Sequence, residues 1–179
     1  MTGVQTCALP IPRDAGEKEW RSASFFDHPK LRLIRNSQRL GLAVSLYEGV
    51  RRASGSFLLF LDSDGNHPPS DLRRLWEKAR EGNDLVLASR YQERRFRPKR
   101  FNDLFSFFLN YFFSRRCPGI SDWTHGYFLV RRALLEHVPL DWIFRGRGEY
   151  SVRLFRSLYE LEPSLRVQEI STQVVPRAH

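Results

Sequence analysis

Cysteine, long apolar runs and acidic residues are all scarce in this sequence. Its 179 residues include two cysteines, Cys7 and Cys117, which are too few for a disulfide framework and lack the paired spacing of a metal site. This scarcity suits a reducing compartment. No apolar run approaches the roughly 20 residues that a membrane-spanning helix requires. We therefore expect neither a disulfide framework nor a segment that crosses a bilayer.

The shortage of acidic residues leaves the chain strongly basic. Lysine and arginine total 29 against 20 aspartates and glutamates, which gives a formal net charge of +9. Such a charge points to an anionic partner, which is a nucleic acid, a phosphorylated small molecule or an acidic membrane surface. A hydrophobic fraction of 41% and an aromatic fraction of 13% are typical of a globular protein, and the length fits a single domain.

Apolar runs of strand length alternate with segments of helical periodicity along the chain. The predicted strands are 30–35, 57–61, 84–89, 127–130 and 166–175. The predicted helices are 42–53, 70–82, 101–113, 132–137 and 149–161, and a further helix is considered around 17–26. Alternation of this kind indicates βαβ units. We therefore predict an α/β fold with a mainly parallel central sheet.

Two aspartates, Asp62 and Asp64, directly follow the apolar run 57–61. In open α/β sheets, ligands gather at the carboxyl ends of the strands. Carboxylates one residue apart can bind the same hard divalent cation, which commonly bridges protein carboxylates and substrate phosphates. Because Asp, Ser, Gly and Asn also favour turns, a simple surface turn is the alternative interpretation.

Residues 92–100, QERRFRPKR, form a strongly basic stretch in front of the aromatic segment 101–113. The basic stretch is interpreted equally well as a solvated connector and as an anion-binding loop. The aromatic segment has the length of a helix. By default such a helix belongs to the core, but its basic flanks would also allow it to lie against lipid headgroups.

Several motifs, in one order, resemble the family 2 glycosyltransferases. They are NSQRLG at 36–41, LDSDGNHPPSDL at 61–72, DLVLASRY at 84–91, DWTHGYFLVRRALL at 122–135 and VQEISTQVVPR at 167–177. The similarity is greatest to the branch that transfers a sugar to a polyprenyl phosphate, typified by dolichol-phosphate mannose synthase. The resemblance implies a GT-A (Rossmann-like) fold, a three-layer α/β/α arrangement with a mainly parallel sheet that lacks the first strands.

The resemblance also implies a metal and donor site. Asp62 and Asp64 match the D-x-D motif that binds Mg²⁺ or Mn²⁺ with the donor diphosphate, and Asn66 is implied as a further metal ligand. Arg90, in Ser-Arg-Tyr, is implied to bind the donor diphosphate, a task that suits a guanidinium. His67, in the H-P-P turn, is interpreted as structural.

The implied acceptor side involves two further segments. The residues implied to bind the acceptor phosphate are Arg97, Lys99, Arg100, Thr124 and Gly126. Asp122 is implied to hold sugar hydroxyls, or to act as a base in relatives whose acceptor is a hydroxyl. An Asp that caps a turn before a strand is the alternative for Asp122. Asp64, Asp122 and Arg90 are thus the expected catalytic residues.

The implied function is an inverting, metal-dependent hexosyl transfer from a nucleotide sugar to a dolichyl or undecaprenyl phosphate. We accordingly expect a membrane surface as a partner, a cytoplasmic location peripheral to the inner face of the membrane, and no nucleic acid. One alternative is a family member that uses a saccharide or lipid hydroxyl as acceptor. A basic nucleic-acid-binding module and an inactive fragment are the others.

The start of the chain departs from the family pattern. Residues 1–11, MTGVQTCALPI, match none of the motifs and are expected to be a non-native leader before a partial catalytic domain at 12–179. The family's P-x-Y-N-E-like and D-D-G-S strands, which hold the nucleoside, are absent from the sequence. We therefore expect part of the nucleotide pocket to be missing. At His125, where the family commonly has Ser, the chain departs again.

Overall fold

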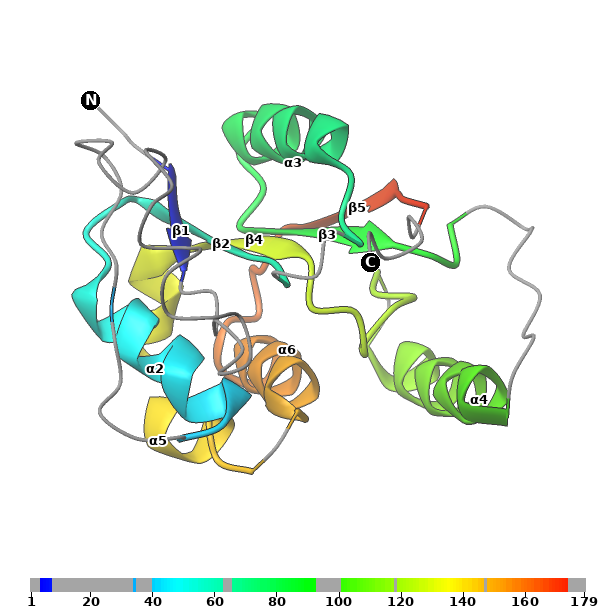
Figure 1. The fold of residues 1–179 in the computed structure, drawn as a ribbon. Helices are drawn as coiled ribbons and strands as arrows, with labels where there is room; N and C mark the ends of the chain where they lie inside the picture. Colours follow the sequence, from blue (N-terminus) through cyan, green and yellow to red (C-terminus); the bar gives the residue numbers. More distant parts are fainter. Residues whose placement is uncertain are drawn as a thin grey trace, which may run out of the picture.

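A five-stranded sheet forms the centre of the computed structural model, which describes residues 4–7, 34, 40–62, 66–92, 101–117, 119–146 and 148–173. Its strands are β1 (Val4–Cys7), β2 (Phe57–Phe60), β3 (Leu85–Ser89), β4 (Phe128–Arg131) and β5 (Val167–Ser171). They lie in the order β1-β2-β4-β3-β5 (Figure 1). The β1–β2 and β3–β5 pairs are parallel, whereas β4 is antiparallel to both of its neighbours. Strands β1, β2, β3 and β5 thus all run in the same direction and only β4 runs against them, so the predicted mainly parallel sheet is confirmed.

Helices cover both faces of this sheet. They are α2 (Leu42–Arg52), α3 (Pro69–Arg80), α4 (Phe101–Arg116), the 3₁₀ helix η2 (Arg132–Glu136), α5 (Leu140–Ile143) and α6 (Tyr150–Leu161). Figure 1 shows α3 on one face, and α2, α5 and α6 on the other. The three-layer α/β/α arrangement agrees with the prediction. Among the described residues, no helix has the length and apolar character needed to traverse a bilayer.

Two apolar clusters hold the layers together, one on each face of the sheet. Strand β2 is buried along its whole length, and its successive side chains point to opposite faces. Phe57 and Leu59 pack with Leu75 of α3, whereas Leu58 and Phe60 join the cluster under α2 and α6. Burial on both faces explains why the strand reads as a continuous apolar run rather than as an alternating pattern.

The H-P-P turn begins helix α3. Pro68 is extended, with φ −61° and ψ 126°, and Pro69 occupies the first helical position, where its missing N–H costs no helical hydrogen bond. Asp71 in the first turn is buried and accepts a hydrogen bond of 2.6 Å from Thr172 Oγ1. This bond fastens the start of α3 to the end of β5.

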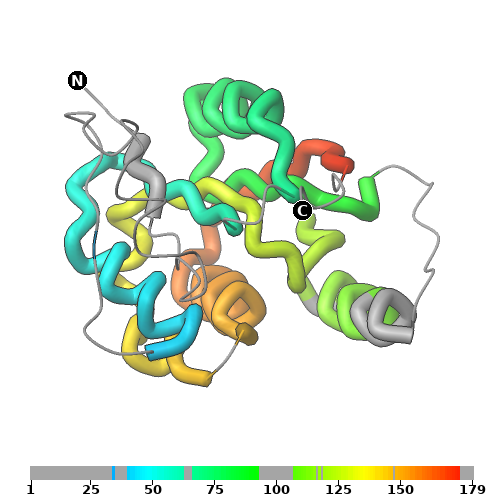
Figure 2. The backbone as a smooth tube through the Cα atoms, viewed as in Figure 1, coloured from blue at the N-terminus to red at the C-terminus, as the bar shows by residue number. Residues whose placement is uncertain are grey.

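The reversed direction of β4 brings several loops to one edge of the sheet. Phe128, the first residue of β4, pairs with Phe60 at the end of β2 and with Leu87 near the end of β3. Consequently the residues that precede β4 lie beside those that follow β2 and β3. The backbone trace in Figure 2 shows these segments meeting at the same edge.

The first strand was not predicted. Residues 4–7 form β1, which pairs in parallel with β2, although the sequence analysis assigned no element there. That residues 1–11 are a non-native leader stays a prediction. The helix considered around 17–26, the predicted strand at 30–35 and the basic stretch from residue 93 to residue 100 lie outside the described residues, except for Ile34.

Candidate functional site

Asp62 lies just beyond the end of β2, with its side chain 44% exposed. The loop before β4 passes close to it at Gly126, where a Cβ atom would lie 3.7 Å from Asp62 Oδ1 and 2.8 Å from the Tyr150 hydroxyl. A side chain at position 126 would therefore collide with the tyrosine. Glycine allows β4, α6 and the β2 carboxylate to approach one another.

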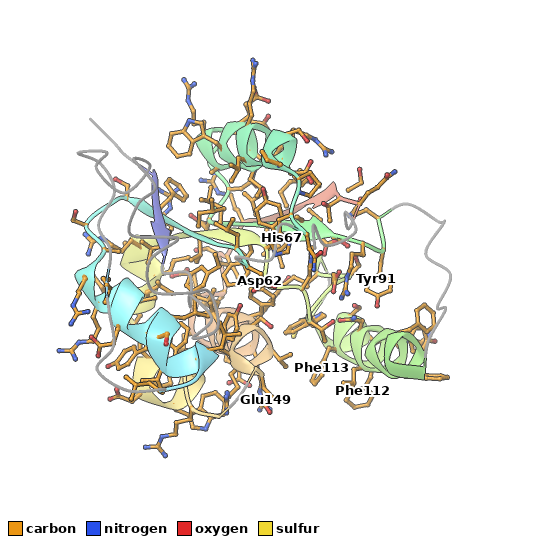
Figure 3. The ribbon with its side chains drawn as sticks, in the orientation of Figure 1. Asp62, His67, Tyr91, Phe112, Phe113 and Glu149 are labelled. Atoms are coloured by element: carbon orange, nitrogen blue, oxygen red, sulfur yellow. The ribbon has the colours of Figure 1, made fainter. Side chains whose placement is uncertain are left out.

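His67 lies next to Asp62 (Figure 3). Its ring is buried, packs 4.4 Å from the Tyr127 ring and 5.0 Å from the His125 ring, and places Nε2 3.5 Å from Asp62 Oδ2. Neither ring nitrogen has a hydrogen-bond partner among the described residues. The interpretation of His67 as a structural residue fits this packing.

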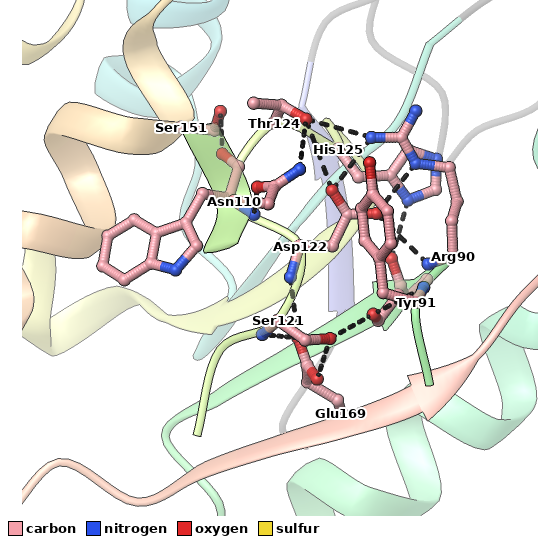
Figure 4. Close-up of polar contacts among 12 residues, drawn as sticks. Arg90, Tyr91, Asn110, Ser121, Asp122, Thr124, His125, Ser151 and Glu169 are labelled. Carbon is pink, nitrogen blue, oxygen red and sulfur yellow. Dashed lines mark hydrogen bonds and ion pairs between the residues drawn. The ribbon is translucent and has the colours of Figure 1, made fainter. Parts of the chain in front are cut away.

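Arg90 and Asp122 form a two-pronged ion pair at the end of β3 (Figure 4). Arg90 Nε donates to Asp122 Oδ2 at 2.8 Å, and Nη2 donates to Oδ1 at 2.9 Å. The main-chain N–H of Arg90 adds a third bond to Oδ2 at 3.1 Å. Asp122 is 0% exposed, so its charge depends on these donors for compensation.

Thr124 extends the ion pair toward helix α4. Its Oγ1 accepts a hydrogen bond from Arg90 Nη2 at 3.0 Å and another from Asn110 Nδ2 at 3.2 Å, and donates to Asp122 Oδ1 at 3.4 Å. Three of the predicted site residues, namely Arg90, Asp122 and Thr124, therefore belong to one hydrogen-bonded network.

Glu169 of β5 is hydrogen-bonded to the loop that carries Asp122. Its carboxylate accepts bonds from the main-chain N–H and the hydroxyl of Ser121, each at 2.7 Å, and from the main-chain N–H of Asp122 at 3.3 Å. Gln92 Nε2 donates to the same carboxylate at 2.9 Å. The sequence analysis did not identify Glu169 as a site residue, because an acidic residue within a strand usually faces solvent.

His125 completes the loop before β4. Its Nδ1 donates to the Ala88 carbonyl oxygen at 2.6 Å. Burial lowers the pKa of His125, and the nearby Arg90 and His67 lower it further, while Asp122 and the bond to Ala88 oppose the shift. The ring is therefore neutral at pH 7 and contributes a buried hydrogen bond rather than a charge.

The predicted site residues are only partly covered by the structure. Asp62 and Gly126 are neighbours, and Arg90, Asp122 and Thr124 are bonded together. Asn66 is described and half-buried. The remaining predicted residues, Asp64, Arg97, Lys99 and Arg100, lie outside the described residues, so their roles stay predictions.

The described part of the proposed metal site offers oxygen ligands. Asp62 supplies a carboxylate and Asn66 an amide, which are the ligand types that Mg²⁺ and Mn²⁺ prefer. Within the described residues, no group of three His, Cys, Asp or Glu side chains converges on one point. The chemistry of this donor set suits a hard divalent cation that is held partly by substrate oxygens.

Comparisons with known proteins agree on one family. The glycosyl transferase family 2 model matches residues 17–138. The dolichol-phosphate mannosyltransferase of Pyrococcus furiosus is 26% identical over 92 residues, which are 51% of this chain and 26% of that protein. The polyprenol monophosphomannose synthase of Mycolicibacterium smegmatis is 29% identical over 128 residues, which are 64% of this chain and 46% of that protein. This chain thus spans less than half of either relative.

Solved structures share the fold. The glucosyl-3-phosphoglycerate synthase of Mycobacterium tuberculosis, in complex with Mn²⁺, uridine diphosphate and phosphoglyceric acid, superposes with a TM-score of 0.58 at 17% identity. The match covers 85% of this chain and 49% of that one. The same enzyme has also been crystallised with Mg²⁺ and uridine diphosphate. A structure described as a mycobacterial protein gives a TM-score of 0.59 at 20% identity, over 82% of this chain and 47% of that one.

Proposed function

The chain belongs to glycosyl transferase family 2 and has its GT-A fold, and we propose that it forms the sugar-transferring part of a polyprenyl-phosphate glycosyltransferase. The donor is a nucleotide sugar and the acceptor is a dolichyl or undecaprenyl phosphate. The observation that carries this proposal is the Arg90–Asp122–Thr124 network at the sheet edge beside Asp62. The names of the two curated relatives agree with this choice of acceptor.

The bonding of Asp122 favours a phosphate acceptor over a hydroxyl acceptor. A hydroxyl nucleophile needs a base to remove its proton, whereas a phosphate oxygen is already ionised at neutral pH. Both carboxylate oxygens of Asp122 accept bonds from Arg90, and Oδ1 also accepts one from Thr124, so the carboxylate is already occupied by donors from the protein. Direct attack of the phosphate oxygen on the anomeric carbon inverts the configuration of the sugar.

The residues that would hold a divalent cation are Asp62, Asp64 and Asn66. A bound Mg²⁺ or Mn²⁺ neutralises the negative charge that develops on the departing nucleoside diphosphate. Within the chain, Asp62 presents its carboxylate at the end of β2 and His67 lies next to it. A nucleic-acid-binding module has no use for a carboxylate at this edge, whereas a diphosphate-metal site requires one.

Transfer assays with the full-length protein test this function. With radiolabelled GDP-mannose and UDP-glucose tried in turn, we expect labelled undecaprenyl phosphate to form with one donor and to disappear when EDTA removes the metal. Asp62→Asn should lower the rate by about a hundredfold or more, because it removes a charged ligand. Asp141→Asn, which changes an exposed aspartate on α5, should leave the rate unaltered. Transfer to oligosaccharide hydroxyls, with the polyprenyl phosphate unused, would contradict the proposal.

Helix α4 supports a further part of the proposal, a peripheral position on the cytoplasmic face of a membrane. Its exposed aromatic side chains include Phe107, Phe108, Tyr111 and Phe112. Arg115 lies over the Tyr111 ring, and the basic residues 93–100 immediately precede the helix in the sequence. Aromatic rings beside cationic groups suit an anionic lipid surface, which also carries the acceptor.

Vesicle binding tests this position. We expect the full-length protein to sediment with phosphatidylglycerol vesicles and much less with phosphatidylcholine vesicles. The double variant Phe108→Ser/Phe112→Ser should weaken binding by about tenfold or more, because each exposed phenylalanine would bury apolar surface in lipid. Trp142→Ser on α5 removes an exposed aromatic away from α4 and is the control. Equal losses in both variants would argue against an α4 contact.

A further inference from the structure

Asn110 is a buried amide that joins helix α4 to the loop before β4 (Figure 4). It is 2% exposed, its Oδ1 accepts a bond of 2.6 Å from the main-chain N–H of Trp123, and its Nδ2 donates to Thr124 Oγ1 at 3.2 Å. Because a main-chain N–H can only donate, the amide oxygen must face Trp123 and the amide nitrogen must face Thr124.

The bonds around Thr124 determine where its hydroxyl proton points. A hydroxyl oxygen has two lone pairs and one proton. Arg90 Nη2 and Asn110 Nδ2 are both donors to Thr124 Oγ1, so they take the two lone pairs. The proton is then left for Asp122 Oδ1, which lies 3.4 Å away. The amide of Asn110 thereby directs the hydroxyl toward the carboxylate.

We propose that Asn110 is a positioning residue for sugar transfer, acting through Thr124 on Asp122. This inference rests on the proposed function and adds to it a residue that orients the acceptor-side loop. Without the amide, the Thr124 hydroxyl regains a lone pair and can rotate away from Asp122. The carboxylate then loses one of the donors that hold it against Arg90.

Ser114 provides a matched control on the same helix. Its hydroxyl lies 2.7 Å from the Ile120 carbonyl oxygen and 2.7 Å from the main-chain carbonyl oxygen of Asn110, so it bonds α4 to the same stretch of chain without contacting Thr124 or the Asn110 amide. Loss of general helix anchoring should therefore affect Asn110→Ala and Ser114→Ala alike. Loss of hydroxyl orientation should affect Asn110→Ala alone.

The kinetic test uses the full-length protein with Asn110→Ala, Thr124→Val, the double variant and Ser114→Ala. We expect Asn110→Ala and Thr124→Val each to lower kcat by about tenfold or more, because small misplacements of reacting groups are costly. The double variant should be no slower than Thr124→Val, since both changes break one chain of bonds. Ser114→Ala should keep kcat within about twofold of the parent while lowering Tm.

A second measurement needs no sugar transfer. Hydrogen exchange at Arg90 Nε, followed by NMR, should become faster in Asn110→Ala and in Thr124→Val but not in Ser114→Ala. A parent protein without transferase activity would refute the proposed function, while the exchange rates would still decide the role of Asn110.

Three outcomes would overturn the inference. The first is Thr124→Val with the parent's kcat and exchange rate, which decides the matter even if Asn110→Ala fails to fold. The second is Ser114→Ala with the same kinetic loss as Asn110→Ala. The third is a double variant whose loss is the product of the two single losses.

Discussion

Asp122→Asn should slow sugar transfer strongly and lower the free energy of unfolding by about 3 kcal/mol. The aspartate is fully buried, and its two oxygens accept the Nε, Nη2 and main-chain N–H groups of Arg90. An asparagine has one acceptor oxygen, and its NH₂ group would face N–H donors of Arg90. The substitution also leaves the guanidinium of Arg90 without its counter-charge. With Arg90 displaced, transfer should fall by about a hundredfold or more.

Asp84→Asn is the matched control for this substitution. Asp84 accepts a bond of 2.7 Å from Arg131 Nε, but this ion pair lies at the opposite end of β3, away from the site. Urea denaturation should show that both variants lose stability, and transfer assays should show that only Asp122→Asn loses activity. An Asp122→Asn enzyme that keeps transfer within tenfold of the parent would remove Asp122 from the site.

Glu169→Ala should have the second largest effect. The change removes the acceptor of the Ser121 and Asp122 main-chain N–H groups, both in a largely buried setting. Each buried donor left without a partner costs about 1–3 kcal/mol, so we expect a loss of about 3 kcal/mol in unfolding free energy. Because the freed loop carries Asp122, transfer should also fall, by about tenfold or more.

Gln92→Ala is the control for Glu169→Ala, because it removes the exposed Gln92 contact of Glu169 and leaves its contacts with Ser121 and Asp122 in place. Gln92 is exposed and donates to the same carboxylate at 2.9 Å, so its loss should change the unfolding free energy by only about 0.5 kcal/mol. Chemical denaturation of both variants supplies the comparison. If Glu169→Ala unfolded at the same urea concentration as the parent, the loop would have to be held by other contacts.

Much of the fold could be predicted because local patterns and tertiary structure agree. The apolar run of β2 is continuous because the strand is buried on both faces. The spacing of Leu72, Leu75, Trp76 and Ala79 predicted α3, in which Leu75 and Ala79 are buried while Leu72 stays 38% exposed. The direction of β4 could not be predicted, since an apolar run of four residues is the same in either direction. Strand β1 lacked any apolar run that would reveal it, because its sequence is VQTC.

The sequence predicted which residues belong to the site, but not which of them contact one another. Asp62, Arg90, Asp122 and Thr124 were identified through a family resemblance, which implied separate tasks for the arginine and the aspartate. The structure instead joins these two residues in one ion pair, a contact across 32 positions that no local pattern encodes. Whether each also takes its implied substrate group stays a prediction.

Asn110 and Glu169 were missed for different reasons. Asn110 lies in the aromatic stretch FFLNYFF, and its isolation among apolar residues was a signal that a buried amide needs a partner. Glu169 alternates with Ile170 in β5, a pattern that predicts an exposed carboxylate. Its burial follows from the Ser121 loop that folds over the strand, which the sequence of β5 does not reveal.

Because β4 is antiparallel to β3, the chain leaves the sheet at the end of β3 and returns to it at the start of β4, on the same edge. Helix α4 and the Asp122 loop both lie between these two points in the sequence. Insertions, deletions or a replacement of α4 need not alter the register of any strand. Ile120 and Trp123 within the same span belong to the core under α2 and α6, so a replacement has to keep these two residues to keep the scaffold.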